Sequence, residues 1–263
     1  MYQGRYFNRL CVNLCGDYMD GEVYPVFQSP GKRRKRCKPT SLIQEKLNQR
    51  NAEKRLTRLV HNNFTEEDMA LHLTYRSGEE PDTAEDAQRD LDNYIRRIKR
   101  RYKKLGIEMK YIRCTEYGKR GGRVHHHMIL TGGLDRDELE RLWGKGYANS
   151  KRLQFEKDGV TGLAHYVAKD KTFFKRWIPS RNLKQPEPTI QDGKITGADI
   201  NALRDAIEER RAWQLFEAMY PGFELVDARC EQNGVNHGWY IHFEMRRKKE
   251  HRPHRGGCRA AIN

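Results

Sequence analysis

The stretch that most constrains the fold is residues 114–130, where two β-type segments flank a turn rich in glycine, lysine and arginine. Gly121 and Gly122 in the turn can adopt the positive φ that a chain reversal needs. The flanking segments are of strand length and carry residues typical of strands. The stretch therefore predicts a β-hairpin with strands over residues 107–116 and 124–130.

The second predicted strand carries three consecutive histidines. Side chains alternate between the two faces of a strand, so His125 and His127 should share one face and His126 should lie on the other. Glu116 lies on the partner strand, where it can add a carboxylate oxygen. Two imidazole nitrogens and a carboxylate oxygen suit one divalent cation, and a three-ligand set leaves coordination positions open for catalysis.

The histidines also have a purely structural interpretation. A histidine in a strand is more often a core or surface residue than a ligand, and this chain has ten histidines. A second feature, residues 163–171, favours chemistry. If this segment is helical, Tyr166 and Lys169 lie one turn apart on the same face. A tyrosine with a neighbouring lysine is a plausible nucleophile with an electrostatic partner.

Taken together, these motifs resemble those of the HUH endonucleases. Within that superfamily the chain is similar to the single-tyrosine rolling-circle replication initiators of small single-stranded DNA viruses, microvirus-type phages and bacterial plasmids. The resemblance covers roughly residues 69–175. The family's first motif, a strand of two apolar residues followed by threonine, is similar to residues 70–75. The pair of histidines matches the second motif, and Glu116 matches its acidic third ligand.

The third motif of the family matches Tyr166 as the nucleophile and Lys169 as its lysine. The resemblance implies a site-specific DNA endonuclease and strand transferase that uses Mg²⁺ or Mn²⁺. It would form a 5′-phosphotyrosine link and release a 3′-hydroxyl primer at a replication origin. We expect four basic residues to contact the single-stranded origin DNA: Lys119, Arg120, Arg123 and Lys171.

The order of the motifs separates related classes. Conjugative relaxases resemble the same fold with the tyrosine ahead of the histidines, whereas Tyr166 follows them here. Asp170, four residues after Tyr166, occupies the position where a two-tyrosine initiator would have its second tyrosine. Two alternatives stay open: a single-tyrosine transposase of the same superfamily, and a non-enzymatic DNA-binding regulator whose histidines are structural or hold zinc.

Composition agrees with a DNA-binding role. Lysine and arginine number 51 against 36 acidic residues, which gives a formal net charge of +15 and favours a polyanionic partner. The sequence has no nucleotide-binding loop of the helicase type, so unwinding during replication would require a host helicase. Its six cysteines show no metal-binding spacing and are predicted to be reduced thiols. With no apolar run of spanning length, we expect a cytoplasmic protein without membrane contact.

Helix periodicity is strongest over residues 83–105, where apolar residues recur every three or four positions. Its outer side is basic and is a candidate lining for the DNA path. The predicted element order is β-α-β-β-α-β-α, with the third strand of the hairpin sheet over residues 152–156. This order predicts an α+β fold of the HUH/RRM-like nuclease type, an antiparallel sheet with helices on one face and the other face free for metal and DNA.

The remaining sequence predicts additions before and after the nuclease domain. A single amphipathic helix is expected over residues 198–219, followed by a hairpin. The predicted division is a basic N-terminal arm over 1–60, the endonuclease domain over 69–177, a linker over 178–196, a C-terminal helix and hairpin over 197–245, and a basic disordered tail over 246–263.

Overall fold

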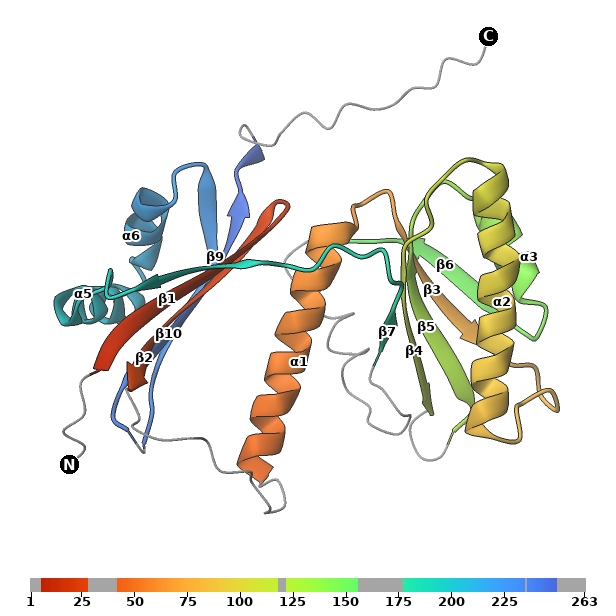
Figure 1. Ribbon diagram of the computed structural model, residues 1–263, viewed down its shortest axis with the longest axis horizontal. Helices are drawn as coiled ribbons and strands as arrows, with labels where there is room; N and C mark the ends of the chain where they lie inside the picture. Colours follow the sequence, from red (N-terminus) through yellow and green to blue (C-terminus); the bar gives the residue numbers. More distant parts are fainter. Residues whose placement is uncertain (1–5, 28–41, 118–121, 156–176, 235, 250–263) are drawn as a thin grey trace, which may run out of the picture. The chain divides into compact units, whose positions relative to one another are not determined.

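The computed structural model describes residues 6–27, 42–117, 122–155, 177–234 and 236–249 (Figure 1). The chain divides into two compact units, one made of residues 1–37 with 186–263 and the other of residues 38–185. Each unit contains a five-stranded sheet in which all paired strands are antiparallel. The predicted α+β class with antiparallel sheet is therefore confirmed.

The unit of residues 38–185 contains the predicted hairpin at the centre of its sheet. The strand order is β6-β3-β5-β4-β7, so β5 lies between β3 and β4. The described elements are α1 (Leu42–Asn63), β3 (Met69–Thr74), α2 (Ala84–Lys104), β4 (Tyr111–Tyr117), β5 (Val124–Leu130), α3 (Arg136–Trp143), β6 (Ala148–Arg152) and β7 (Ile178–Pro179).

Helix α2 follows the predicted boundaries closely. The side chain of Thr83 accepts a hydrogen bond from the backbone N–H of Asp86 and caps the first turn. Gly106, at φ 68°, lets the chain leave the helix in the left-handed conformation. The apolar stripe buries Leu91 and Ile98 completely, which fixes the helix on the sheet.

The two faces of this sheet are packed differently. On one face α2 and α3 cover a core that includes Leu71, Leu73 and Met128. On the other face, α1 contributes Leu56 and Leu59, among others, to a second core. Figure 1 shows α1 and α2 on opposite sides of the sheet. The strand residues in the second core lie toward one end of that face: Ile112, Cys114 and Ile129. The remainder of the face is available for Glu116 and the histidines.

Strand β6 begins earlier than the strand predicted over 152–156. It pairs with β3, with Met69 opposite Arg152. The segment lacks the β-branched and aromatic residues that mark strands in a sequence. Its position is set instead by tertiary contacts, because the Ser150 hydroxyl and N–H both donate to the Glu140 carboxylate at 2.7 and 3.0 Å.

The other unit joins the two ends of the chain in one sheet of order β8-β1-β2-β10-β9. The predicted segment 1–60 is thus divided between the units, and the predicted linker 178–196 contains two paired strands, β7 and β8. Arg9 and Asp192 form an ion pair across β1 and β8 at 2.6 Å. Its elements are β1 (Tyr6–Cys15), β2 (Tyr18–Phe27), β8 (Pro188–Asp192), α5 (Gly197–Glu208), α6 (Ala212–Met219), β9 (Phe223–Gln232) and β10 (Trp239–Arg247).

The single helix predicted over 198–219 is two helices, α5 and α6. Arg210 between them has φ 58°, a conformation that a continuous helix cannot contain. The break lets both helices bury apolar residues in the same core, with Leu203 from α5 and Phe216 from α6. None of the helices in the described ranges is both long enough and apolar enough to span a bilayer.

Close packing in this unit predicts a strong effect of Gly21→Ala. Gly21 lies opposite Phe243, and an added Cβ would overlap the fully buried Phe243 ring. Phe216 and Tyr220 hold that ring from two sides, with centroids 4.6 and 5.7 Å away. We expect Gly21→Ala to lower the free energy of unfolding by about 1–3 kcal/mol in chemical denaturation.

Gly197→Ala is the matched control, since its added Cβ would meet no atom within 4 Å and neither glycine has a positive φ. It should change stability little. Adding Phe243→Leu to Gly21→Ala should recover part of the loss by making room. A Gly21→Ala protein as stable as the wild type would contradict the described packing.

Candidate metal centre

The pairing of β4 with β5 places the predicted ligands together. Glu116 lies directly opposite His125, and His127 is two residues further along β5 on the same face. One carboxylate oxygen, Glu116 Oε1, accepts hydrogen bonds from Nε2 of both histidines, at 2.7 Å from His125 and 2.9 Å from His127. These three side chains are only 10–18% exposed. The three predicted ligand atoms therefore converge on one point that is largely shielded from solvent.

A hydrogen bond orients the His125 ring for binding. Its Nδ1 lies 3.1 Å from the backbone oxygen of Arg123. When His125 is neutral, Nδ1–H donates to this carbonyl and Nε2 keeps its lone pair. Metal-binding histidines commonly donate their second ring nitrogen to a backbone carbonyl in this way. The assignment leaves the Nε2 lone pair directed toward Glu116 and His127.

The spacing of the donors fits a divalent cation. Adjacent ligands of an octahedral ion, each about 2.1 Å from it, are about 3.0 Å apart. The 2.7 and 2.9 Å separations from Oε1 to the two Nε2 atoms are close to this value. Small side-chain rotations would let an ion replace the shared protons, as is usual when a metal displaces protons from its ligands. Glu116, His125 and His127 could thus hold one ion with positions open to solvent or substrate.

The electrostatics of the cluster reflect the shared carboxylate. Burial alone would raise the pKa of Glu116, but the hydrogen bonds from His125 and His127 outweigh burial and lower it to about 2. The same hydrogen bond from Glu116 raises the pKa of His125 despite partial burial. Without metal, the carboxylate is therefore ionised and His125 is held in its protonated form near neutral pH.

The middle histidine has a different environment, as strand alternation predicts. His126 is fully buried on the α2 side of the sheet. Its Nε2 lies 2.9 Å from the Tyr75 hydroxyl and its Nδ1 lies 2.8 Å from Thr115 Oγ1, which also accepts from Gln88. Burial first, and then the neighbouring positive charges of His125 and Arg113, lower the pKa of His126 to about 3. This neutral, hydrogen-bonded imidazole is structural.

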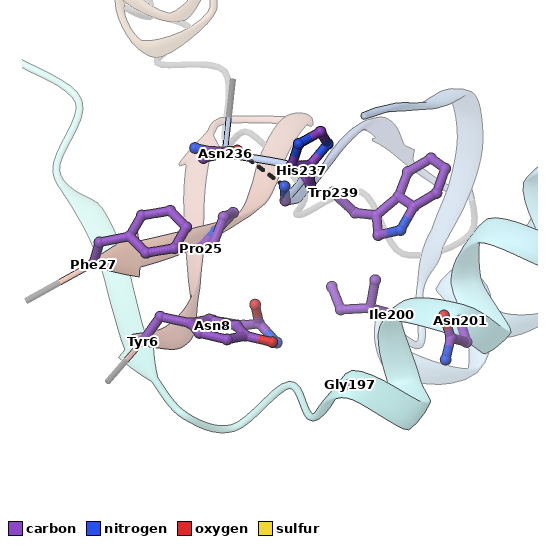
Figure 2. Close-up of a pocket in the computed structure, with 11 residues that line it drawn as sticks. Tyr6, Asn8, Pro25, Phe27, Gly197, Ile200, Asn201, Asn236, His237 and Trp239 are labelled. Carbon is purple, nitrogen blue, oxygen red and sulfur yellow. Dashed lines mark hydrogen bonds between the residues drawn. The ribbon is translucent and has the colours of Figure 1, made fainter. Parts of the chain in front are cut away.

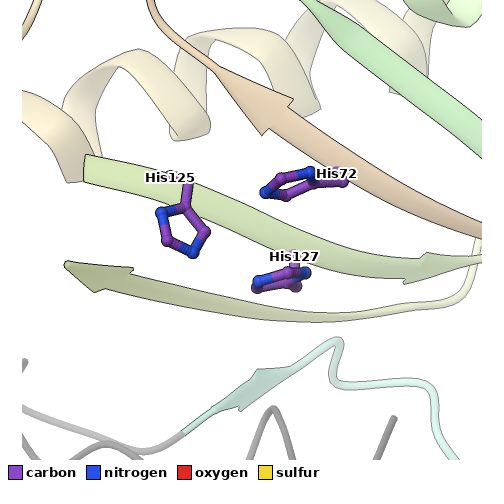
Figure 3. A group of neighbouring side chains, drawn as sticks. All are labelled: His72, His125 and His127. Atoms are coloured by element: carbon purple, nitrogen blue, oxygen red, sulfur yellow. The ribbon is translucent and has the colours of Figure 1, made fainter. Parts of the chain in front are cut away.

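Sequence reasoning missed His72, which lies on β3 opposite His127. Figure 3 shows its ring beside those of His125 and His127. One nitrogen from each of the three rings lies within 4.8 Å of the others. Burial and the nearby His127 and His125 lower the pKa of His72 to about 4, which keeps the ring neutral. The clue in the sequence was parity: His72 precedes Thr74 by two residues, so it shares the Thr74 face of a strand that neighbours β5.

The remaining predicted site residues have different outcomes. Tyr166, Lys169 and Lys171 lie outside the described residues, as do Lys119 and Arg120. Arg123 is described, with an exposed side chain that forms an ion pair with Glu80 at 3.0 Å. It lies directly before β5, close in sequence to the histidines.

The basic side of α2 does not border the candidate centre. Helix α2 packs on the sheet face opposite Glu116, and part of its positive charge has structural partners. Arg97 donates to the backbone oxygens of Leu142 and Trp143, both at 3.1 Å. Arg101 pairs with Glu138 of α3 at 3.0 Å. These arginines fasten α3 to α2, so the predicted DNA path along α2 would have to be separate from the histidine cluster.

A pocket of about 880 Å³ in the other unit is a second concave site. Figure 2 shows Tyr6 and Phe27 on one side and Trp239 and Asn201 on the other. Among the described residues that line it, none is acidic and His237 is the sole histidine. The pocket therefore offers aromatic and amide contacts but not a set of metal ligands.

Comparison with known proteins agrees with the location of the candidate centre. Residues 68–171 match the model of a family of replication-associated proteins, the ORF2 family. The match covers β3, β4 and β5 and therefore all four cluster residues. No curated protein and no solved structure matched the chain. The family match supports a replication-associated protein that binds DNA, in the role of a replication initiator.

The charge states of the cluster can be tested by NMR on metal-free protein at a pH of about 5.5, between the lowered and the ordinary histidine values. We expect His72 and His126 to be neutral, because their pKa values lie below this pH. His125 should be protonated, because Glu116 raises its pKa above the ordinary 6.5. Long-range ¹H–¹⁵N spectra distinguish imidazole from imidazolium.

Glu116→Gln provides the control, since it keeps the side-chain shape and removes the negative charge. The pKa of His125 should then fall. A His125 titration identical in the wild type and Glu116→Gln would contradict the described hydrogen bond.

Proposed function

We propose that this protein is a replication initiator that nicks single-stranded DNA at an origin by metal-dependent tyrosine attack, and later rejoins the strand in rolling-circle replication. The observation that carries the proposal is the convergence of Glu116, His125 and His127 within the segment that matches the replication-associated family. A pair of imidazoles and a carboxylate on a rigid hairpin is a suitable site for Mg²⁺ or Mn²⁺ next to a phosphate.

A cation held by Glu116, His125 and His127 would polarise a non-bridging oxygen of the scissile phosphate and stabilise the charge of the transition state. The protein supplies the geometry. The β4–β5 register holds the carboxylate opposite the imidazoles, and the Arg123 carbonyl fixes the tautomer of His125. Because these groups lie on paired strands rather than in a loop, little reorganisation is required when DNA binds.

Tyr166 is the proposed nucleophile. Its phenolate oxygen attacks phosphorus, a P–O bond to the tyrosine forms, and the bond from phosphorus to the 3′-oxygen of the preceding nucleotide breaks. The 3′-oxygen leaves and takes up a proton as the 3′-hydroxyl primer, while the phosphate remains linked to the 5′ end. A tyrosine of ordinary pKa near 10 is mostly protonated at neutral pH, so Lys169 would stabilise the tyrosinate or the phosphate charge.

The covalent link preserves the phosphodiester bond energy for rejoining. A later 3′-hydroxyl can attack the phosphotyrosine, release Tyr166 and restore the strand. The net charge of +15 supports binding to the phosphate backbone, which is independent of DNA sequence. Arg123, with Lys119, Arg120 and Lys171, is the proposed set of DNA contacts around the hairpin. Strand separation would be the task of a host helicase.

The test is a search for a covalent adduct. The full chain is incubated with Mn²⁺ and single-stranded oligonucleotides that tile its own locus, and adducts that resist SDS are detected by gel. We expect an adduct with the wild type, and loss of the adduct to background with EDTA or with Tyr166→Phe, which removes the attacking oxygen. Tyr166→Phe should still bind DNA.

Tyr147→Phe is the matched control, because Tyr147 is an exposed tyrosine of the same unit that has no part in the proposed chemistry. It should form the adduct normally. An adduct that survives Tyr166→Phe would refute the assignment of the nucleophile. Tight DNA binding that persists in EDTA, with no adduct from any oligonucleotide, would favour the non-enzymatic regulator instead.

A further inference from the structure

His72 is the histidine of the cluster to which neither the hairpin nor the family match assigns a role. It belongs to β3, the strand on the other side of β5 from Glu116, and its register partner is His127. Its ring stacks on His127 with centroids 4.7 Å apart and planes 11° apart. It meets His125 edge-on at 5.1 Å and 90°. Three adjacent strands thus contribute polar groups to one point on the sheet.

The nitrogens of the three rings are close to the spacing of ligands on one ion. Opposite ligands of a single ion, each about 2.1 Å from it, are about 4.2 Å apart. The nitrogen atoms of His72, His125 and His127 already lie within 4.8 Å of one another. The His72 side chain is exposed, so its ring can rotate by the small amount required without disturbing a core.

Packing alone does not account for this arrangement. An exposed ring gains little free energy from burial, and the sheet core on this face is formed by α1 and the apolar residues at its other end. A histidine that stacks on one proposed ligand and points an edge at another is placed to join them. Figure 3 shows the three rings converging from β3 and β5.

We propose that His72 is a direct ligand of the same ion, which makes the centre three imidazole nitrogens and one carboxylate oxygen. The inference rests on the metal site of the proposed function but not on the nicking reaction. A third imidazole changes the choice of ion. Mg²⁺ prefers oxygen ligands and retains its waters, whereas imidazole suits transition metals such as Co²⁺ and Zn²⁺, and Mn²⁺ accepts both kinds of ligand. His72 therefore directs the site to Mn²⁺ or Co²⁺ and against Mg²⁺.

Two measurements on the full chain test this assignment without any activity assay. Pulsed EPR of the Mn²⁺-loaded protein counts the imidazole nitrogens on the ion, and we expect three in the wild type. Titration calorimetry gives the dissociation constants for Co²⁺, Mn²⁺ and Mg²⁺. Loss of partners outside the ligand sphere costs about 10- to 100-fold in metal affinity, so loss of a ligand should weaken Co²⁺ binding by at least about 10-fold. The Mg²⁺ affinity should change much less.

The informative variant is His72→Phe, which keeps an aromatic ring to stack on His127 but has no nitrogen. If His72 is a ligand, the variant has two nitrogens on Mn²⁺ and weakened Co²⁺ binding. If His72 only positions His127 by stacking, the variant behaves as the wild type. His72→Gln serves as a second variant if His72→Phe does not fold. His237→Asn removes a histidine from the other unit and should change nothing.

The outcomes separate this inference from the proposed function. A wild-type count of two nitrogens, with binding abolished by His127→Ala, would overturn the role of His72 and leave the metal site intact. A wild-type protein that binds none of the three ions would overturn both. A count of three in the wild type and two in His72→Phe supports the assignment.

Discussion

The register between β4 and β5 is the constraint on which the candidate centre depends. Glu116 faces His125 directly, and the carboxylate reaches His127 only because both histidines lie on the same face of the strand. A slip of one residue would turn every side chain of a strand to the opposite face. The metal-binding set would then be broken, and His126 would replace its neighbours. A centre of this kind needs a register that cannot slip.

The three consecutive histidines contribute to that register from both faces. His126 points into the core, where Tyr75 and Thr115 bond its two ring nitrogens and Trp143 packs against it at 5.5 Å. Removing these partners from a buried imidazole would cost about 1–3 kcal/mol for each group left unpaired. The buried histidine therefore holds β5 in the one alignment that directs His125 and His127 toward Glu116. Structure and chemistry are divided between adjacent residues by the alternation of the strand.

Local patterns in the sequence predicted much of this unit. The hairpin, the separation of His126 from its neighbours and the boundaries of α2 follow from periodicity and turn residues, which act over short distances. His72 escaped prediction because its contact with His127 depends on β3 pairing with β5, a strand far along the chain. The position of β6 and the pairing of β1 with β8 are also set by contacts between distant segments. Parity of side chains was readable from the sequence, but strand neighbours were not.

The central claim is that Glu116, His125 and His127 form a metal centre, and anomalous diffraction from crystals soaked in Mn²⁺ tests it most directly. The account predicts one strong anomalous peak at this cluster, about 2.0–2.3 Å from a Glu116 carboxylate oxygen and from Nε2 of each histidine. The hydrogen bonds that now join these atoms would be replaced by bonds to the ion. Soaked crystals in which Glu116 keeps both hydrogen bonds and no peak lies at the cluster would contradict the claim.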